Sequence, residues 1–448
     1  MKIYFVCSPS LGILDNWLPI IYELKEKKIN AEFVFVFPKP NAADKIDLNS
    51  TLIQVSINIF DSILIKSHSG LWIEKKSFNE VKKIALLSNF TKFCYRLINF
   101  SMRYNSLKFL GKTLRSIFSS VDYLKHTKNL WNINEIENTS GIVLYDVYEE
   151  QKNYNSDLIP LFNKFPKFSI SHGINIDTDS IKNQYIDINR NPYDKVYLFS
   201  ELEKEYYKES FFLKDEVLSV VGIPRHEEDW ISKITNIESL NISETFFDSY
   251  AFIISRSISD YFTYERKKEA IVNIKKIVID KLNIKVIVKC HPKETTEGLY
   301  ESIFGMNDYG ITWEYSNKHP FFLGSKSLFA ISFFSGVSLD MIANETPTIE
   351  YLNLNDISKY DNKNALRDEN DDVMFSYRYH GFVLGSSNCV DFEKNVYNVM
   401  NHQEEVLNDF KTNYLKKFSS STGSIKKVSD DILSVMNKLK NDKDLIIE

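Results

Sequence analysis

The stretch Lys285 to Glu294, KVIVKCHPKE, decides how the rest of this chain is interpreted. Its apolar residues, Val286 to Val288 with Cys290, are followed by Pro292 and predict a short buried strand. In open α/β sheets, ligands bind beyond the carboxyl ends of the strands. His291 is therefore expected to face a crevice, although a capped strand end with a surface histidine would show the same pattern.

A second stretch, Leu328 to Leu352, alternates strand and helix in the same way. A strand over 328–332 precedes a turn at Ser335–Gly336, a short helix over 338–343 and a second strand over 348–352. The free backbone N–H groups at the start of that helix, together with the serine hydroxyls, predict an anion site. A third stretch, SISHGINIDTD at 169–179, predicts a strand that ends at His172.

The length and composition place the chain among globular proteins of more than one domain. With 448 residues, about two or three domains are expected. Hydrophobic residues make up 43% and charged residues 26%, which is typical of a folded protein. The net charge of -5 argues against a nucleic-acid-binding protein, which would need clustered positive charge.

Cysteine and glycine usage excludes several kinds of site. The four cysteines lie far apart without a C-x-x-C pair, so neither a zinc site nor a disulfide framework is predicted. The chain has 14 glycines and neither a G-x-G-x-x-G nor a P-loop motif, so side chains and a helix start are expected to hold any phosphate. No signal peptide and no apolar run of about 18 residues is found, so we expect a cytoplasmic protein.

The first 240 residues predict one Rossmann-like domain. Residues 1–37 read as strand, helix, strand, which indicates a parallel sheet with the loop at 8–15 on its carboxyl edge. Later strands end at Asp146, at His172 and before the Gly-Ile-Pro-Arg segment at 222–225, which predicts one crevice lined by strand ends.

Residues 81–121 have a different composition from the rest of this domain. They contain eight Lys or Arg and no Asp or Glu, interleaved with aromatic residues. A basic helical insertion of this kind can rest on an anionic membrane surface, which would place the protein peripherally on the inner face of the membrane. The alternative is a pair of helices that pack on the first domain and leave their lysines solvated.

A second Rossmann-like domain is predicted over 249–390, after a linker at 236–248, and a helical tail over 391–448. The tail is expected to form helices over 391–410 and 424–439. The predicted architecture is therefore two α/β domains that face a central cleft, with helices at the C-terminus.

Three segments carry a resemblance to known families. Two tandem domains with polar strand ends resemble the GT-B fold of nucleotide-sugar glycosyltransferases. VIVKCHPKE resembles the His-Pro motif of bacterial sialyltransferases, capsule Kdo transferases and CDP-glycerol glycerophosphotransferases, and SFFSGVSLDMIANETPTIEYL resembles the segment that follows it there. SHGIN with GIPRHEEDW resembles segments of the glycerophosphotransferases and, more loosely, of UDP-N-acetylglucosamine 2-epimerases.

Displacing a nucleotide from a sugar requires stabilisation of the departing phosphate and a base for the acceptor hydroxyl. On the donor side, cationic or hydrogen-bonding groups are expected to bind the phosphates, and a carboxylate is expected to bind the ribose. The phosphate-binding candidates are His291, Lys289, Lys293, Arg256, Ser335, Gly336 and Ser338, and the carboxylate is Glu350. The first candidate for the base is His172, because the ordinary pKa of histidine is near neutrality, and the alternative is Asp146 or Glu149. Acceptor contacts are expected at Ser10, Gly12 and Arg225, whereas no metal and no cofactor is expected despite the D-x-D triplet at 177–179.

The resemblance implies a metal-independent, inverting glycosyltransferase of bacterial surface-polysaccharide assembly. Its donor would be a nucleotide sugar, with CMP-Kdo or a CMP-sialic-type sugar favoured, and its acceptor a glycan or lipid-linked glycan. A CDP-glycerol-type polyol-phosphate transferase, a UDP-sugar 2-epimerase-like enzyme and a catalytically silent nucleotide-sugar-binding scaffold remain alternatives.

Overall fold

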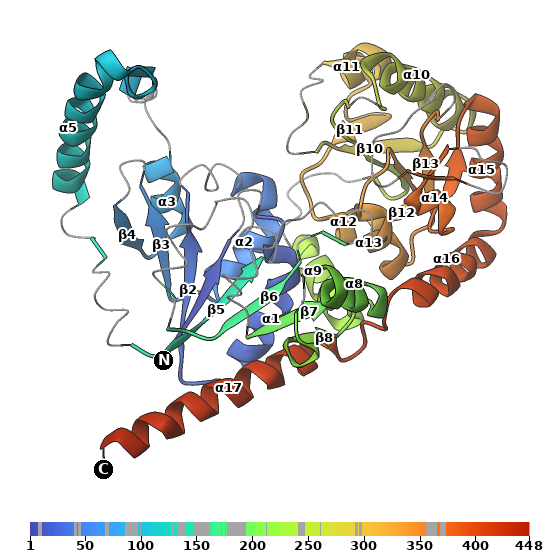
Figure 1. Ribbon diagram of the computed structural model, residues 1–448. Helices are drawn as coiled ribbons and strands as arrows, with labels where there is room; N and C mark the ends of the chain where they lie inside the picture. Colours follow the sequence, from blue (N-terminus) through green and yellow to red (C-terminus); the bar gives the residue numbers. More distant parts are fainter. Residues whose placement is uncertain are drawn as a thin grey trace.

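The computed structural model describes residues 1–7, 11–39, 43, 46–67, 71–85, 97–98, 100–126, 130–131, 139–146, 162, 164–171, 173–174, 176, 194–211, 213–240, 247–259, 261–291, 294, 298–354, 365–367 and 373–447. These residues form two sheets with helices packed around them (Figure 1). The predicted fold class, two α/β halves with parallel sheets and C-terminal helices, is confirmed.

The first sheet has eight strands in the order β4-β3-β2-β1-β5-β6-β7-β8. All neighbours pair in parallel except β3 and β4, which are antiparallel. The strands β1 and β2 are buried almost throughout, as expected for parallel strands covered on both faces. The strands are β1 (Lys2–Val6), β2 (Glu32–Phe37), β3 (Ser62–Lys66), β4 (Trp72–Lys75), β5 (Gly141–Asp146), β6 (Lys167–Ile170), β7 (Lys195–Leu198) and β8 (Leu218–Val220).

The helices of the first half connect these strands in the manner of βαβ units. In α1, the apolar residues recur at helical spacing, and this face packs into the main core. The helices are α1 (Leu14–Glu26), α2 (Ser50–Ile57), α3 (Phe78–Ala85), α5 (Lys108–His126), α8 (Glu201–Phe211) and α9 (Glu228–Leu240), with the short helices η2 (Asp47–Asn49), η3 (Asn105–Leu107), η7 (Asp215–Val217) and η8 (Pro224–His226).

The second sheet has six parallel strands in the order β11-β10-β9-β12-β13-β16. The KVIVK segment forms β10, next to the central strand β9. A separate antiparallel pair joins β14 (Ala365–Arg367) to β15 (Val373–Phe375). The six strands are β9 (Tyr250–Ile254), β10 (Lys285–Lys289), β11 (Trp313–Tyr315), β12 (Ser327–Ser332), β13 (Thr348–Tyr351) and β16 (Leu384–Ser386).

Helices of the second half flank this sheet and continue to the C-terminus. The segment expected as one helix over 391–410 is two helices, because His402 leaves the helical conformation (φ -135°, ψ 39°). The helices are α10 (Tyr264–Ile274), η9 (Lys275–Lys281), α11 (Leu299–Phe304), η10 (Met306–Asp308), α12 (Pro320–Ser325), α13 (Val337–Ala343), α14 (Ser376–Tyr379), α15 (Cys389–Asn401), α16 (Gln403–Lys417) and α17 (Ser424–Ile447).

The last helix, α17, runs back from the second half along α1 of the first half (Figure 1). Lys27 Nζ binds Asp430 Oδ1 at 2.8 Å across this contact. Gly222 makes the crossing possible, because a Cβ atom there would lie 2.5 Å from the carbonyl oxygen of Ser420, and its φ is +81°. Among the described residues, no helix is long and apolar enough to cross a membrane.

Candidate functional site in the cleft between the two sheets

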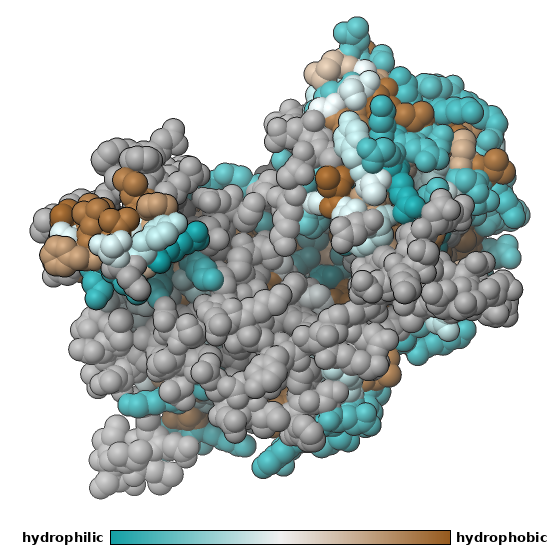
Figure 2. Space-filling view, turned by 45° about the horizontal axis from the view of Figure 1, so that its top comes forward, coloured by the Kyte–Doolittle hydropathy of each residue, from teal (hydrophilic) through white to brown (hydrophobic). Residues whose placement is uncertain are grey.

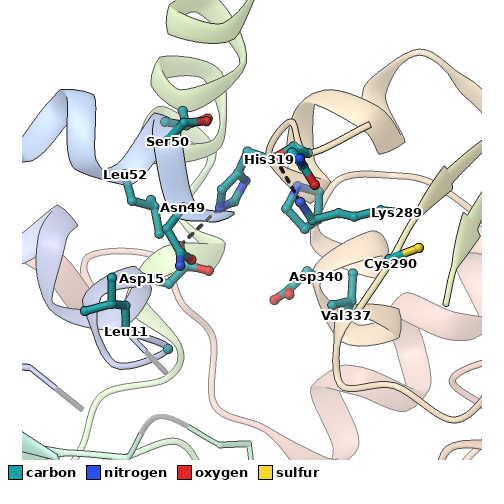
Figure 3. A pocket seen from close by; sticks show the side chains of 14 residues that line it. Leu11, Asp15, Asn49, Ser50, Leu52, Lys289, Cys290, His319, Val337 and Asp340 are labelled. Atoms are coloured by element: carbon teal, nitrogen blue, oxygen red, sulfur yellow. Dashed lines mark hydrogen bonds and ion pairs between the residues drawn. The ribbon is translucent and has the colours of Figure 1, made fainter. Parts of the chain in front are cut away.

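A cavity of about 160 Å³ lies between the two halves, where the loops after β1 and β10 meet (Figure 3). This arrangement follows from parallel sheets, in which the loops after the strands gather at one edge. We call this cavity the cleft pocket. Its lining consists of Leu11, Gly12, Asp15, Asn49, Ser50, Thr51 and Leu52 from the first half and Lys289, Cys290, Asn317, His319, Pro320, Val337 and Asp340 from the second.

A carboxylate and an imidazole approach each other across the cleft pocket (Figure 3). Asp15 lies in the first turn of α1, and its Oδ1 is 3.4 Å from Nε2 of His319. The other ring nitrogen of His319, Nδ1, accepts the backbone N–H of Phe321 at 3.3 Å and caps α12. A neutral His319 therefore carries its proton on Nε2, which faces Asp15. Asp15 Oδ1 is buried and, apart from this 3.4 Å approach of His319, makes no hydrogen bond among the described residues, so it can also accept one from a bound ligand.

A second carboxylate fixes the backbone of His319. Glu238 of α9 accepts the backbone N–H of His319 at 3.0 Å and the hydroxyl of Thr51 from α2. Lys318 Nζ lies 3.5 Å from the other oxygen of Glu238. Because Glu238 bonds both to Thr51 of α2 and to the backbone of His319, it fixes the position of the histidine relative to α2.

Lys289 supplies a positive charge from the end of β10. Its Nζ donates to the carbonyl oxygen of Asn317 at 3.0 Å. Burial lowers the pKa of Lys289 to about 8, so the ammonium group is largely charged at neutral pH and titrates slightly above it. Such a group can neutralise a phosphate oxygen.

A buried ion pair joins the two halves beside the cleft pocket. Asp340 Oδ1 of α13 accepts from Arg225 Nε at 2.8 Å and lies 2.7 Å from His226 Nε2. Arg225 also donates from Nη1 to Asn16 Oδ1 of α1 at 2.8 Å. Burial opposes ionisation of Asp340, but Arg225 and His226 outweigh it and hold the pKa of Asp340 at about 2. We call Arg225, His226, Asp340 and Asn16 the interdomain network, because its hydrogen bonds join the two halves beside the cleft.

A neighbouring cavity of about 340 Å³ opens beyond β10. It shares Cys290 and Asn317 with the cleft pocket, so the two hollows adjoin. His291, which is exposed, and Glu294 belong to its lining. We call this second hollow the side cavity.

The structure brings three of the sequence-predicted residues to this region. Gly12 and Lys289 line the cleft pocket, and His291 lines the side cavity. Arg225, expected to contact an acceptor, is bound to Asp340 in the interdomain network. Asp146 lies at the end of β5 with 1% of its surface exposed.

Other predicted donor-binding residues lie at the carboxyl edge of the second sheet but outside the lining of the cleft pocket. Arg256 donates to the carbonyl oxygen of Phe334 and sits over that ring, 5.2 Å from its centroid. Ser335, Gly336 and Ser338 surround the start of α13, where the Ser335 hydroxyl already accepts the N–H of Val337.

Glu350, expected to bind a ribose, is completely buried at the end of β13. Its Oε1 accepts from Arg378 Nε at 2.6 Å, whereas Oε2 has no hydrogen-bond partner among the described residues. Burial raises the pKa of Glu350 despite the nearby guanidinium. Its role toward a ribose stays a prediction, and Arg378 is the partner that the structure provides.

The remaining predicted residues, His172, Glu149, Lys293 and Ser10, lie outside the described residues. The role of His172 as the base therefore stays a prediction. Among the described residues, no group of three or more His, Cys, Asp or Glu side chains is placed to hold a metal ion.

Sequence reasoning missed three residues of the cleft pocket: Asp15, His319 and Asp340. A signal existed for His319, because His319-Pro320 is a second His-Pro pair that follows a strand, here β11. Asp15 closes the loop that was expected at the carboxyl edge of the first sheet. Nothing in the sequence pairs Asp340 with Arg225, because these residues are 115 positions apart.

Solved structures with the same fold span the whole chain. No protein-family model and no curated protein matches this sequence. The UDP-GlcNAc 2-epimerase from Neisseria meningitidis bound to UDP-GlcNAc is 13% identical with a TM-score of 0.54, and the alignment covers 97% of this chain and 100% of that one. The UDP-GlcNAc 2-epimerase from Methanocaldococcus jannaschii in complex with UDP-GlcNAc and UDP is 14% identical with a TM-score of 0.52 and the same coverage. At these identities the similarity shows the fold, which is the GT-B type predicted from the sequence.

Proposed function

We propose that this protein is an enzyme that acts on a nucleotide-activated sugar, and that its reaction is of the UDP-sugar 2-epimerase type. The observation that carries this proposal is the cleft pocket itself, where Asp15 and His319 face each other beside Lys289. The fold adds support, since it is shared over nearly the full length with enzymes whose structures contain UDP-GlcNAc.

The sizes of the two hollows suggest how such a ligand would be divided between them. Ligand pockets usually measure about 300–1,000 Å³, so the cleft pocket alone is small for a whole nucleotide sugar. We assign the sugar and its phosphates to the cleft pocket and the nucleoside to the side cavity. Lys289, at the boundary, would then neutralise a phosphate, and His291 would donate to the nucleotide.

Epimerisation at C2 needs a group that removes the C2 proton and a group that returns a proton to the opposite face. The electron pair of the broken C–H bond would form a C1–C2 double bond as the C1–O bond to the nucleotide phosphate breaks, and the phosphate would rebond to C1 when the proton returns. Asp15 suits the first task, because its buried Oδ1 has no hydrogen-bond partner among the described residues. His319 Nε2–H would orient that carboxylate and stabilise its charge. Asp146, His172 and Glu149 remain proposed partners on the side of the first sheet, and Arg256, Ser335, Gly336, Ser338 and Glu350 remain proposed donor contacts.

A glycosyltransferase is the second candidate function. It is favoured by the His-Pro segment of β10, because His291 lines the side cavity where a nucleotide would lie. The donor would be CMP-Kdo, a CMP-sialic-type sugar or a CDP-polyol, and the acceptor a glycan or lipid-linked glycan. Asp15 would then accept the proton of the acceptor hydroxyl.

One experiment distinguishes the two reactions. The purified protein is incubated with UDP-GlcNAc alone, and with CMP-, CDP- and UDP-activated donors plus glycan acceptors, while proton NMR follows sugar configuration and nucleotide release. We expect the 2-epimer of UDP-GlcNAc to form without an acceptor. Acceptor-dependent release of CMP or UDP would favour the transferase, and the absence of both products would refute the proposed enzyme.

The role of Asp15 is tested by Asp15→Asn, with the exposed Asp280→Asn as the matched control. General acid–base groups contribute about 10² to 10⁴ in rate, so turnover should fall at least about a hundredfold in Asp15→Asn. The affinity for UDP, measured by calorimetry, should change little, because the substituted group contacts the sugar. A variant that loses UDP affinity but keeps its turnover would contradict this role.

A further inference from the structure

An exposed helical arm stands out from the first half of the molecule, on the side away from the second sheet (Figure 1). We define the basic arm as residues 97–98 and 100–117, which include the start of α5. Gly111 of α5 packs against the preceding helical residues, since a Cβ atom there would lie 3.0 Å from Met102 Cγ and 3.2 Å from Ser101 Cβ. The arm is therefore a close-packed helical hairpin and can present its side chains as one surface.

Several large apolar side chains of the basic arm are exposed to solvent. Phe109 is 82% exposed, and Ile117 is 54% exposed. Phe100 and Tyr104 pack against each other with ring centroids 4.9 Å apart, yet each is more than half exposed. Packing on the first sheet, the alternative considered from the sequence, therefore does not account for these side chains. Figure 2 shows hydrophobic side chains gathered on this arm.

The charge of the basic arm is opposite to that of the protein as a whole. Its four cations are exposed, and it contains no Asp or Glu, although the chain carries a net charge of -5. Lys108, Lys112 and Arg115 follow each other at spacings of four and three residues, so they share one face of α5. Leu110, Leu114 and Ile117 follow the same spacing on the opposite face. This is the division of an interfacial amphipathic helix, with a basic face and an apolar one.

We propose that the basic arm docks the protein on an anionic lipid bilayer. The apolar face of α5 would enter the boundary between headgroups and acyl chains, and the lysines and arginines would reach the lipid phosphates. Two copies of the arm would repel each other through their like charges, which disfavours self-association through this face. A bilayer also explains the exposed phenylalanine and isoleucine, for which a polyanion such as nucleic acid offers no apolar partner.

The test uses the full chain and two kinds of vesicle, phosphatidylcholine alone and an equal mixture with phosphatidylglycerol. The wild-type protein should co-sediment with the anionic vesicles only, and less at high salt. The triple variant Lys108→Glu, Lys112→Glu, Arg115→Glu should lose binding on the order of a hundredfold, at about fivefold for each cation removed. The matched control reverses three exposed lysines elsewhere, Lys268→Glu, Lys276→Glu and Lys438→Glu, and should bind like the wild type.

A second variant tests the apolar contribution. Phe109→Ser with Ile117→Ser should weaken binding by at least about tenfold while circular dichroism stays unchanged, because both side chains are exposed in the free protein. The proposal is overturned if the wild type stays in the supernatant, or if the two charge-reversal variants bind equally. It is also overturned if Phe109→Ser dissociates an oligomer seen by ultracentrifugation, since the partner would then be a second copy.

Discussion

Replacing Asp340 by asparagine tests how strongly the interdomain network holds the two halves together. The substitution keeps the shape of the side chain but removes the charge that faces Arg225, whose side chain is only 8% exposed. Breaking one side of a buried ion pair costs about 3–5 kcal/mol, because the other charge stays buried without compensation. Asp15 Oδ2, 3.8 Å from Arg225 Nε, offers partial compensation, so we expect about 3 kcal/mol. The lowering of the Asp340 pKa from 3.8 to about 2 corresponds to a similar value, about 2.5 kcal/mol.

The free energy of unfolding is measured by urea titration, followed by the fluorescence of the five tryptophans. The matched control is Asp430→Asn, which removes an equally short ion pair to Lys27 at a site where the aspartate is 54% exposed. Exposed pairs contribute about 0–1 kcal/mol, so the control should remain close to the wild type. If Asp340→Asn also lost less than about 1 kcal/mol, the network would not be what fixes the two halves.

The pH dependence of this difference is a further check on the same residue. The pKa of Asp340 is lower in the folded protein than in the unfolded chain, so its carboxylate stabilises the fold fully above about pH 5. That contribution is lost as the pH falls through about 3.8 toward 2. The stability difference between the wild type and Asp340→Asn should therefore shrink over this interval. A difference that stays constant down to about pH 2 would contradict the assignment of the ionised carboxylate.

Two other predictions concern Lys289 and Arg378. Because burial holds the pKa of Lys289 at about 8, raising the pH from about 7 to about 9 should remove its charge and weaken UDP binding on the order of tenfold. Calorimetry on Lys289→Met should show weak binding that does not change over this interval; equal pH dependence in both proteins would place the titrating group elsewhere. Arg378→Met should lower the free energy of unfolding by about 3 kcal/mol, since it leaves Glu350 buried without its cation. Adding Glu350→Gln should recover part of that loss in urea titrations, and no recovery would show that the arginine acts mainly through its bonds to the backbone carbonyls of Leu352 and Ser386.

The local elements of both sheets could be predicted from the sequence. The short strand expected within Lys285 to Glu294 is β10, which ends at Lys289, before His291. The strands expected over 328–332 and 348–352 are β12 and β13, with ends that differ by one residue. These strands are covered on both faces, so each appears in the sequence as a nearly continuous apolar run. Strand order could not be predicted in this way. That β1 lies between β2 and β5, for example, depends on which helices cross which face of the sheet.

The candidate site also contains residues that the sequence predicted and contacts that it could not predict. Lys289 and Gly12 were identified because Lys289 ends a strand and Gly12 lies in the loop after one, and the carboxyl ends of parallel strands gather at one edge of a sheet. The contact between Asp15 and His319 could not be predicted, because it depends on the angle between two sheets. Arg225 and Asp340, which are far apart in the sequence, make one of the contacts that join the two halves at that angle.

By itself, the sequence determined the alternation of strands and helices, the α/β class and the basic composition of residues 81–121, since these depend on residue type and spacing along the chain. Only the tertiary structure decided which side chains share the cleft pocket, that α17 returns to α1, and that the apolar face of the basic arm is exposed. The physical reason is that burial, desolvation and ion pairing depend on distances between residues far apart in the chain. The spacing of residues along the sequence does not specify those distances.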